Sequence, residues 1–212
     1  MKTLARADTP HGEIALRDRG GITELVVNGV FAMDSVDVSS ELALAEAAGP
    51  TPGNVLVGGL GLGFTAARLL DLGAAAVEVV ELAGPLIDWA RAGLTPTLGR
   101  VASDPRVRLH HGDIVDWLGD HPGPWDAILL DVDNGPSFLI HEGNARVYGA
   151  DWLRLATTRL APDGCLVVWC ETRSPELAGT LAAVPLLVTE RLVAVQREGR
   201  DLEYALYVGR VG

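Results

Sequence analysis

The sequence predicts an α/β protein built on a mostly parallel sheet, with a small β-element at its N-terminus. From about residue 52 onward, short apolar runs alternate with helical segments, a pattern typical of strands that are buried on both faces between helices. Before that point, short strands are separated by glycine turns. The chain has 212 residues, of which 48% are hydrophobic, and this fits one α/β unit with a substantial core.

The N-terminal segment up to about Asp34 is predicted to be a β-meander. Strands are expected at residues 13–17, 22–27 and 30–33. Asn28 and Gly29 form a strong hairpin-turn signal because both tolerate positive φ. A helix is expected to begin at Ser39 and to end before Gly49-Pro50. We therefore divide the chain into residues 1–50, an N-terminal β-hairpin and helix, and residues 51–212, the main domain.

The main domain is predicted to alternate strands and helices and to close with an antiparallel hairpin. The expected strands cover residues 54–57, 76–81, 107–110, 125–131 and 165–170. Helical segments are expected from the glycine turn to about 72, and at 85–94, 114–118, 148–160 and 175–183. A turn is expected at Pro162-Asp163-Gly164, and the final hairpin pairs residues 186–195 with 202–208 around the turn Arg197-Glu198-Gly199-Arg200.

Composition and charge exclude several classes of partner. The net charge is −11 and the basic residues are scattered, which argues against nucleic acid and is compatible with a cationic substrate. The two cysteines, Cys165 and Cys170, have an odd spacing in one strand and are expected to be buried free thiols. No signal peptide or membrane span is expected, so we predict a cytoplasmic protein that does not bind a membrane. His110-His111 lacks further ligands at metal spacing, so no metal is expected.

Glycines follow the first strand of the main domain. The turn reads Gly58-Gly59-Leu60-Gly61-Leu62-Gly63. Glycines here allow a sharp turn and let a ligand approach the N-terminus of the next helix closely. The four glycines Gly58, Gly59, Gly61 and Gly63 are therefore candidate cofactor-binding residues.

Acidic residues follow the next three strands. Glu81 ends the second strand, Asp113 follows the third, and Asp131 ends the fourth, with Asp133 and Asn134 directly after it. Ligands bind beyond the carboxyl ends of parallel strands, so we expect these groups to converge. An acid at Glu81 can accept hydrogen bonds from ribose hydroxyls, and Asp113 can accept from an adenine amino group. The set favours a neutral or cationic adenosyl ligand.

NAD is the alternative cofactor. The run Gly61-Leu62-Gly63-Phe64-Thr65-Ala66 matches the dinucleotide pattern G-x-G-x-x-G/A, with Glu81 at a suitable distance. That interpretation does not account for Asp113 and Asp131, and the terminal hairpin is unusual for it.

These residues resemble the spermidine synthase family of class I transferases that use S-adenosylmethionine (SAM). The most specific match is the run from Trp125 to Pro136, an apolar strand, an aspartate and a loop closing in Gly-Pro. Further landmarks are Val55-Leu56-Val57-Gly58-Gly59, Val79-Val80-Glu81-Leu82, Asp104-Pro105-Arg106-Val107, His111-Gly112-Asp113, Leu160-Ala161-Pro162-Asp163-Gly164 and the N-terminal hairpin around Asn28-Gly29. The resemblance implies the seven-stranded, Rossmann-like SAM-dependent methyltransferase fold.

The resemblance also implies roles for individual residues. Glu81 would hold the ribose of SAM or of decarboxylated SAM, and Asp113 the adenine. Asp131 matches the aspartate that deprotonates the attacking amine in aminopropyltransferases. Neighbouring residues complete the candidate set. Leu82 and Ile114 would contact the cofactor, and Asp133, Asn134 and Tyr148 would contact a small-molecule acceptor, with an amine as the first candidate. The resemblance also makes a homodimer the candidate assembly.

The sequence also departs from the family. True spermidine synthases place an acid inside the glycine loop, where this chain has Gly61 and Leu62. The family's glutamine and its Tyr-His-Glu run have no match in Met33-Asp34-Ser35 or in the helix after Ser39. Three hypotheses follow: alkyl transfer to an amine with Asp131 as base, methyl or aminocarboxypropyl transfer from ordinary SAM, and non-catalytic SAM binding.

Overall fold

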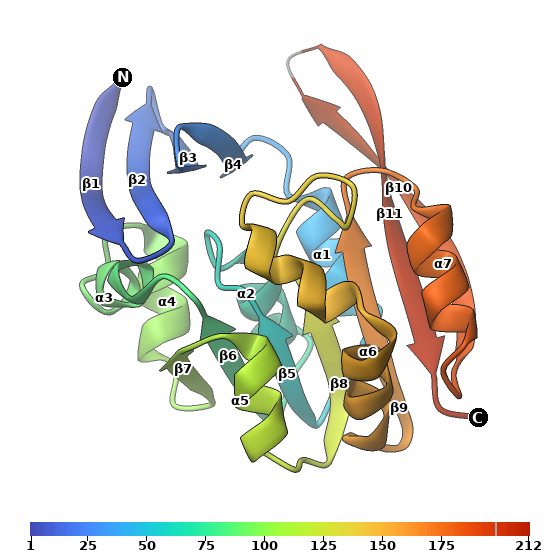
Figure 1. Ribbon diagram of the computed structural model, residues 1–212. Coiled ribbons are helices and arrows are strands. Elements are labelled where there is room, and N and C mark those ends of the chain that lie inside the picture. The colour runs from blue at the N-terminus through green and yellow to red at the C-terminus, as the bar shows by residue number, and fades with distance from the viewer. Residues whose placement is uncertain (198) are drawn as a thin grey trace.

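The central sheet has seven strands in the order β10-β11-β9-β8-β5-β6-β7 (Figure 1). The computed structural model describes residues 1–197 and 199–212. Five strands run parallel: β5 (Asn54–Gly58), β6 (Ala76–Glu81), β7 (Val107–His111), β8 (Trp125–Leu130) and β9 (Leu160–Cys170). The last two, β10 (Leu187–Arg197) and β11 (Arg200–Arg210), form an antiparallel hairpin whose β11 pairs with β9. The predicted parallel sheet and terminal hairpin are confirmed, although Glu198 of the expected turn lies outside the described residues.

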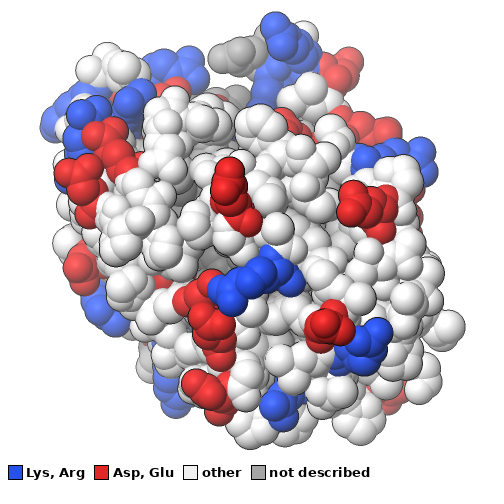
Figure 2. All heavy atoms as spheres, viewed as in Figure 1, with Lys and Arg blue, Asp and Glu red and all other residues white. Residues whose placement is uncertain are grey.

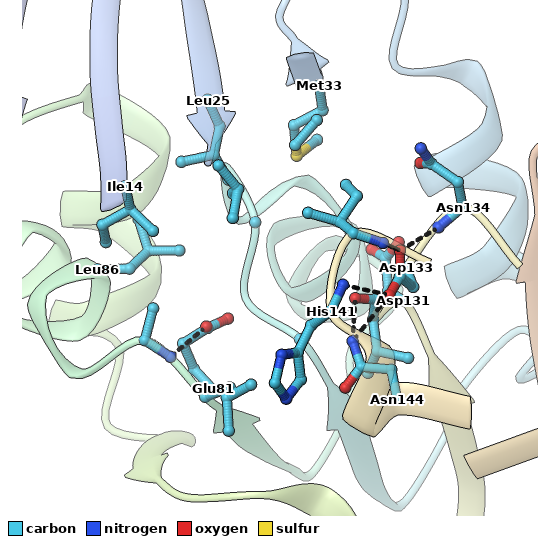
Figure 3. A pocket seen from close by; sticks show the side chains of 18 of the residues that line it. Ile14, Leu25, Met33, Glu81, Leu86, Asp131, Asp133, Asn134, His141 and Asn144 are labelled. Carbon is cyan, nitrogen blue, oxygen red and sulfur yellow. Dashed lines mark hydrogen bonds between the residues drawn. The ribbon is translucent and has the colours of Figure 1, made fainter. Parts of the chain in front are cut away.

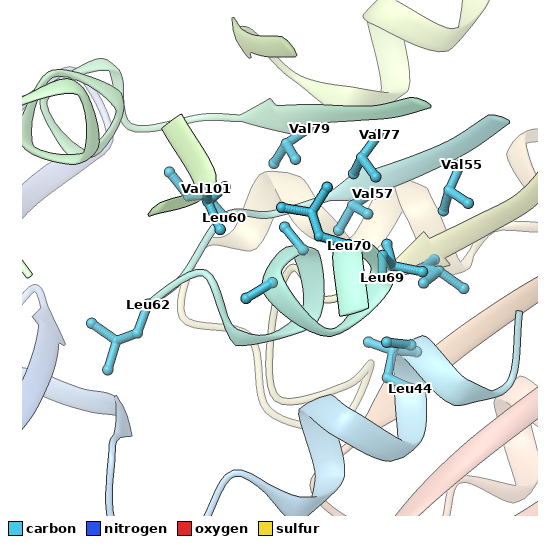
Figure 4. Packing of buried hydrophobic residues seen from close by; sticks show 14 of the residues in the cluster. Leu44, Val55, Val57, Leu60, Leu62, Leu69, Leu70, Val77, Val79 and Val101 are labelled. Carbon is cyan, nitrogen blue, oxygen red and sulfur yellow. The ribbon is translucent and has the colours of Figure 1, made fainter. Parts of the chain in front are cut away.

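Helices cover both faces of this sheet. One face packs against α1 (Ser39–Glu46), α2 (Phe64–Asp71), α3 (Gly84–Arg91) and α4 (Pro96–Ser103). The other packs against α5 (Ile114–Asp120), the 3-10 helix η1 (Glu142–Tyr148), α6 (Ala150–Thr158) and α7 (Pro175–Ala182). Successive strand residues point to opposite faces, so Val55 and Val57 join the first cluster and Leu56 the second. Figure 4 shows the first cluster, with β5 and β6 packed against Leu69 and Leu70 of α2.

A separate antiparallel sheet lies above the carboxyl ends of the central strands (Figure 1). Its strands, in order, are β1 (Lys2–Thr9), β2 (Gly12–Arg19), β3 (Ile22–Val27) and β4 (Val30–Asp34). The predicted turn is confirmed, because Asn28 and Gly29 have φ of 52° and 76°. Helix α1 packs against α2 and β10 of the main unit, and the division of the chain at residue 50 stays a prediction.

Three elements of the structure differ from the sequence predictions. Strand β1 was not expected, because Lys2–Thr9 is a largely exposed edge without clear alternation and is stabilised by pairing with β2. Helix α4 was also not expected, although Thr95 caps its N-terminus by accepting from Leu98 N at 3.2 Å. The helix expected at 148–160 begins only at Ala150, because Gly149 is extended (φ −74°, ψ 145°).

The turn expected at residues 162–164 lies within β9. Asp163 has a φ of 63°, and the register with β8 shifts in this part of the strand. The strand therefore begins at Leu160, and the left-handed residue produces an irregularity in the strand.

Charged side chains of both signs are interspersed on the face seen in Figure 2, with broad uncharged areas between them. Several arginines are paired with acids, among them Arg68 with Glu46 and Arg106 with Asp104. Both cysteines are buried and free. Within the described ranges, no helix has the length and apolar character needed to cross a membrane.

Candidate functional site

A cavity of about 210 Å³ lies between the N-terminal sheet and the carboxyl ends of the central strands (Figure 3). Ile14, Leu25 and Met33 contribute to its wall from the N-terminal sheet. Most of the candidate residues line it: Gly59, Gly61, Glu81, Leu82, Asp113, Ile114, Asp131, Asp133 and Asn134. The strand ends therefore converge as the sequence predicts.

Three candidate residues do not line the cavity. Gly58 is the last residue of β5, and a Cβ there would meet Val132, Leu130 and Ile114 at 3.1–3.3 Å. Gly63 takes a left-handed conformation at the start of α2, with a φ of 85°. Tyr148 is buried in the hydrophobic cluster on the face covered by α5, α6 and α7, and burial raises the pKa of its hydroxyl. Gly58, Gly63 and Tyr148 therefore lie behind the residues that line the cavity and do not face it.

The glycine turn is built directly against the Asp131 segment. Gly59 has a φ of 92°, and a Cβ there would lie 2.1 Å from the backbone oxygen of Asp131. Asp131 N donates to Gly58 O at 2.8 Å. The close approach of the two backbones requires glycine at position 59, because any side chain would push the segments apart.

Met33 covers the position where the family resemblance leads one to expect an acid. A Cβ on Gly61, which has a φ of 52°, would lie 2.7 Å from Met33 Sδ. Leu62 N donates to the same sulfur at 3.2 Å. The glycine turn therefore presents backbone and a thioether to the cavity at this point, with no carboxylate.

Glu81 is buried at the end of β6, where the sequence predicts a ribose-binding acid. Its Oε2 accepts a hydrogen bond from Leu60 N at 2.8 Å, and its Oε1 accepts from Ala83 N at 2.7 Å. Burial raises the pKa of this carboxyl, and the two backbone donors act in the opposite direction. The donors fix the carboxylate at the cavity wall, and each oxygen keeps a second lone pair for a ligand.

Asp113 caps helix α5 at the edge of the cavity. Its Oδ1 accepts from Val115 N at 2.8 Å, and its Oδ2 is paired with Arg146 of η1. Arg146 also contacts Asp116, at 3.3 Å. The sequence does not predict this ion pair, which makes Asp113 a charge-paired group rather than a free acceptor.

Asp131 is the first residue after β8, half-buried in the middle of the cavity. Its Oδ2 accepts a hydrogen bond from Thr65 Oγ1, at the start of α2, at 2.7 Å. Burial raises the pKa of Asp131 to about 7, and the negative charges of Glu41 and Glu81 act in the same direction. The Thr65 hydrogen bond opposes them. This carboxyl group can therefore exchange a proton near neutral pH.

Glu41 of α1 lies at the cavity but is not among the site residues that the sequence predicts. Its side chain is buried, lines the cavity and accepts from Ser40 Oγ at 2.7 Å. Burial raises its pKa. In the sequence it resembles any acid in the first turn of a helix. The helix after Ser39 therefore does supply an acid to the site, and only the packing of α1 reveals it.

Asp133 organises the loop after β8. Its Oδ1 accepts from Asn134 N at 2.9 Å and Ile140 N at 2.7 Å, and its Oδ2 accepts from His141 N at 3.3 Å and Asn144 Nδ2 at 3.0 Å (Figure 3). The carboxylate is thus used in folding the loop over the cavity. Asn134 lines the cavity beside it, and its backbone oxygen accepts from Glu171 N at 3.0 Å.

The far end of the cavity lies over β9, β11 and β10. Trp169 and Tyr204 form an edge-to-face pair with ring centroids 5.1 Å apart, and both line the cavity. Glu171, half-buried, and Arg197 line it as well. In the part of the chain that is described, no three His, Cys, Asp or Glu side chains are grouped so as to hold a metal ion.

Comparison with known proteins finds curated relatives and solved structures that are similar to this chain. No protein-family model matches the chain. It is 25% identical over 226 residues to a polyamine aminopropyltransferase of Synechococcus sp. (strain JA-2-3B'a(2-13)), a match that covers 97% of this chain and 70% of the relative. It is 29% identical over 161 residues to that of Corynebacterium efficiens, covering 74% of this chain. That match covers only 30% of the relative's length.

A solved structure is similar to the whole of this chain, and a methyltransferase is similar to part of it. A crystal structure of a spermidine synthase in complex with the transition-state analogue AdoDATO superposes with a TM-score of 0.82 at 16% identity, covering 100% of this chain and 74% of that one. A stretch of 113 residues, 52% of this chain, is 31% identical to 15% of the ribosomal RNA large subunit methyltransferase K/L of Pseudomonas aeruginosa. The first similarity confirms the predicted fold. Together with the aminopropyltransferase matches, it confirms that this chain resembles the spermidine synthase family of class I transferases.

Proposed function

We propose that the chain transfers an alkyl group from a SAM-type donor to an amine, with Asp131 as the base. The observation that carries this proposal is a single one: a half-buried carboxyl with a pKa raised to about 7 lies in the middle of the cavity. A carboxylate with an ordinary pKa accepts a proton from an amine poorly at neutral pH. Burial raises the pKa of Asp131 toward that of the amine, and this makes the proton transfer more favourable.

The residues at one end of the cavity fit the adenosyl part of the donor. Glu81 presents a fixed carboxylate suited to a pair of ribose hydroxyls. A Cβ at Gly112 would meet no atom within 4 Å, which leaves open space at the wall for a flat base. Val80, Leu86 and Ile114 supply apolar contact there. When bound, a sulfonium donor supplies an electrophilic carbon and leaves as a neutral thioether.

The acceptor supplies the attacking amine, and side chains of this protein bind it and accept its proton. The amine nitrogen attacks the carbon next to sulfur, the C–S bond breaks with its electron pair going to sulfur, and the amine proton passes to Asp131. Glu41 lines the cavity, its charge acts on Asp131, and it favours a cationic acceptor. Thr65 keeps the Asp131 carboxylate oriented.

We expect kcat/KM to rise with pH and to level off above about pH 7. Asp131 accepts a proton only in its charged form, and its pKa of about 7 places that form in the minority below neutral pH. In Thr65→Val the rise should move to higher pH, because the lost hydrogen bond stabilises the carboxylate. Steady-state rates between pH 5.5 and 9 test this. A flat profile in both proteins would contradict a role for Asp131 as base.

Methyl transfer from SAM is the second candidate function. Met33 occupies the place where a loop acid would hold an aminopropyl amine, and part of the chain is similar to a ribosomal RNA methyltransferase. In that case Asp131 positions the acceptor, while the donor end of the cavity is used in the same way.

Calorimetric titration followed by a product screen tests the proposal. SAM, decarboxylated SAM, methylthioadenosine and NAD would be titrated separately, and the adenosyl compounds are expected to bind more tightly than NAD. Each donor would then be incubated with putrescine and analysed by mass spectrometry. Spermidine would indicate aminopropyl transfer, and a methylated amine would favour the second candidate. Preferential binding of NAD would overturn both.

A further inference from the structure

The far end of the cavity contains a buried guanidinium with few partners. Arg197 is the last residue of β10, lines the cavity, and has a side chain only 12% exposed. Its Nη2 donates to Asp37 O at 3.4 Å, and its Nη1 lies 3.7 Å from Asp34 Oδ1, beyond hydrogen-bond distance. Its buried Nε has no hydrogen-bond partner among the described residues. A guanidinium has five N–H donors, and most of those of Arg197 make no hydrogen bond to another described residue.

Two aromatic rings surround this guanidinium. The Phe31 centroid lies 5.5 Å from Arg197 Cζ, and the Tyr204 centroid lies 6.0 Å away. Rings hold a guanidinium by cation–π attraction but do not satisfy its N–H groups. An anion that entered the cavity would therefore meet a desolvated donor that already has a fixed orientation.

The C-terminal hairpin is tied in place beside the cavity. Gln196 N donates to Asp37 Oδ2 at 2.7 Å, and Ser39 Oγ donates to Ala194 O at 3.4 Å. These contacts join β10 to Asp37, which precedes α1, and to the first residue of α1. The backbone just before Arg197 is thus anchored at Ala194 and Gln196 without a ligand.

Arg197 lies on the acceptor side of the cavity. Across the sheet, Asp113 follows β7, Glu81 ends β6 and Asp131 follows β8, whereas Arg197 belongs to β10 at the opposite edge. The residues suited to the nucleoside occupy the first edge, with Asp131 between the two. A group bound at Arg197 therefore belongs to the molecule that approaches Asp131 from the other side.

We propose that the acceptor carries a carboxylate as well as an amine, and that Arg197 binds this carboxylate. The inference rests on the proposed function and names its substrate class. The amine lies beside Asp131 and Glu41, which favour a cation, and the carboxylate pairs with the planar guanidinium fork. The neighbouring acids repel a dianion such as phosphate more strongly than a carboxylate. A diamine would place its second ammonium group next to the positively charged Arg197, and the two charges would repel each other.

Two ligands of equal length test this pairing. 4-Aminobutanoate and 1,4-diaminobutane would be titrated calorimetrically into the protein, with and without S-adenosylhomocysteine. We expect 4-aminobutanoate to bind at least about tenfold more tightly. Arg197→Gln should remove this preference, and Arg197→Glu should reverse it. Arg191→Gln is the matched control, since Arg191 is an exposed arginine of the same strand outside the cavity lining, and it should bind like wild type.

A second variant separates ligand binding from a purely structural role. Asp34→Asn removes the acid beside Arg197 and leaves the guanidinium in place. We expect it to bind 4-aminobutanoate more tightly and the diamine more weakly than wild type does. If Arg197 only stabilises the structure through its ion pair with Asp34, the affinities for the two ligands will not change. That result, or equal binding of the two ligands by wild type and Arg197→Gln, overturns the inference.

The same titrations distinguish this inference from the proposed function. Failure of all adenosyl compounds to bind, with no product from any donor, would overturn the proposed function. Tight donor binding and transfer to the diamine, unaffected by Arg197→Gln, would overturn only the carboxylate assignment.

Discussion

Asp131→Asn is expected to reduce transfer by about 10²–10⁴-fold while leaving donor affinity nearly unchanged. Asparagine keeps the size of the side chain and an oxygen for the Thr65 hydrogen bond, but it accepts no proton from the attacking amine. Single-turnover rates and calorimetric titration of the donor, run on the same preparations, measure the two quantities. Asp120→Asn, at the exposed end of α5, is the control and should show wild-type rates. Unchanged turnover in Asp131→Asn would remove this residue from the mechanism.

The same variant is expected to be more stable than wild type at pH 8. Folding raises the pKa of Asp131 from 3.8 to about 7, so between these values the folded protein binds a proton that the unfolded chain has released. The stability of wild type therefore falls as pH rises through this window. The amide side chain introduced by Asp131→Asn carries no charge, and we expect a gain on the order of 1–3 kcal/mol at pH 8 that disappears near pH 4. Urea unfolding at both pH values measures it, and an equal effect at both would contradict the raised pKa.

Gly59→Ala is expected to destabilise the fold by about 3–5 kcal/mol and to abolish donor binding. The new Cβ would lie 2.1 Å from the backbone oxygen of Asp131, at a φ of 92° that side chains rarely adopt. Backbone atoms cannot rotate away, so the glycine turn and the Asp131 segment must separate. Both Asp131 and the donor end of the cavity are then displaced. Thermal unfolding and donor titration measure the two losses.

Gly119→Ala is the matched control for this change. Gly119 lies in helix α5, and a Cβ there meets no atom within 4 Å. Alanine restricts the unfolded chain and favours helix, so we expect this variant to be more stable by about 0.4–1 kcal/mol. Wild-type donor affinity in Gly59→Ala would show that the close approach of the two backbones is unnecessary for the site.

Local patterns in the sequence predicted most of the main sheet. The apolar run of β8 and the strand β6, expected at residues 76–81 and found there, reflect burial on both faces. Elements with weaker local signals were missed. Strand β1 has a mixed composition and is stabilised by β2, and α4 is a short helix close after α3 that buries only Leu98 and Val101.

The residues missed in the site have a common cause. Glu41 lies 90 positions before Asp131 in the numbering, and Arg197 lies after it on the last hairpin. Neither belongs to a motif that marks a ligand site. Glu41 resembles a helix-start acid and Arg197 an ordinary turn-flanking charge, so only the packing of α1 and β10 brings them to the cavity.

The sequence by itself determined the fold class and the set of acids at the carboxyl ends of the strands, because strand ends follow from local periodicity. Only the tertiary structure decided how each acid is engaged. Asp133 is used by four donors of its own loop, and Asp113 is paired with Arg146. Asp131 keeps one hydrogen-bond donor, Thr65, and has Glu41 beside it. Thr65 and Glu41 come from segments distant in the chain from Asp131, whose pKa is raised to about 7.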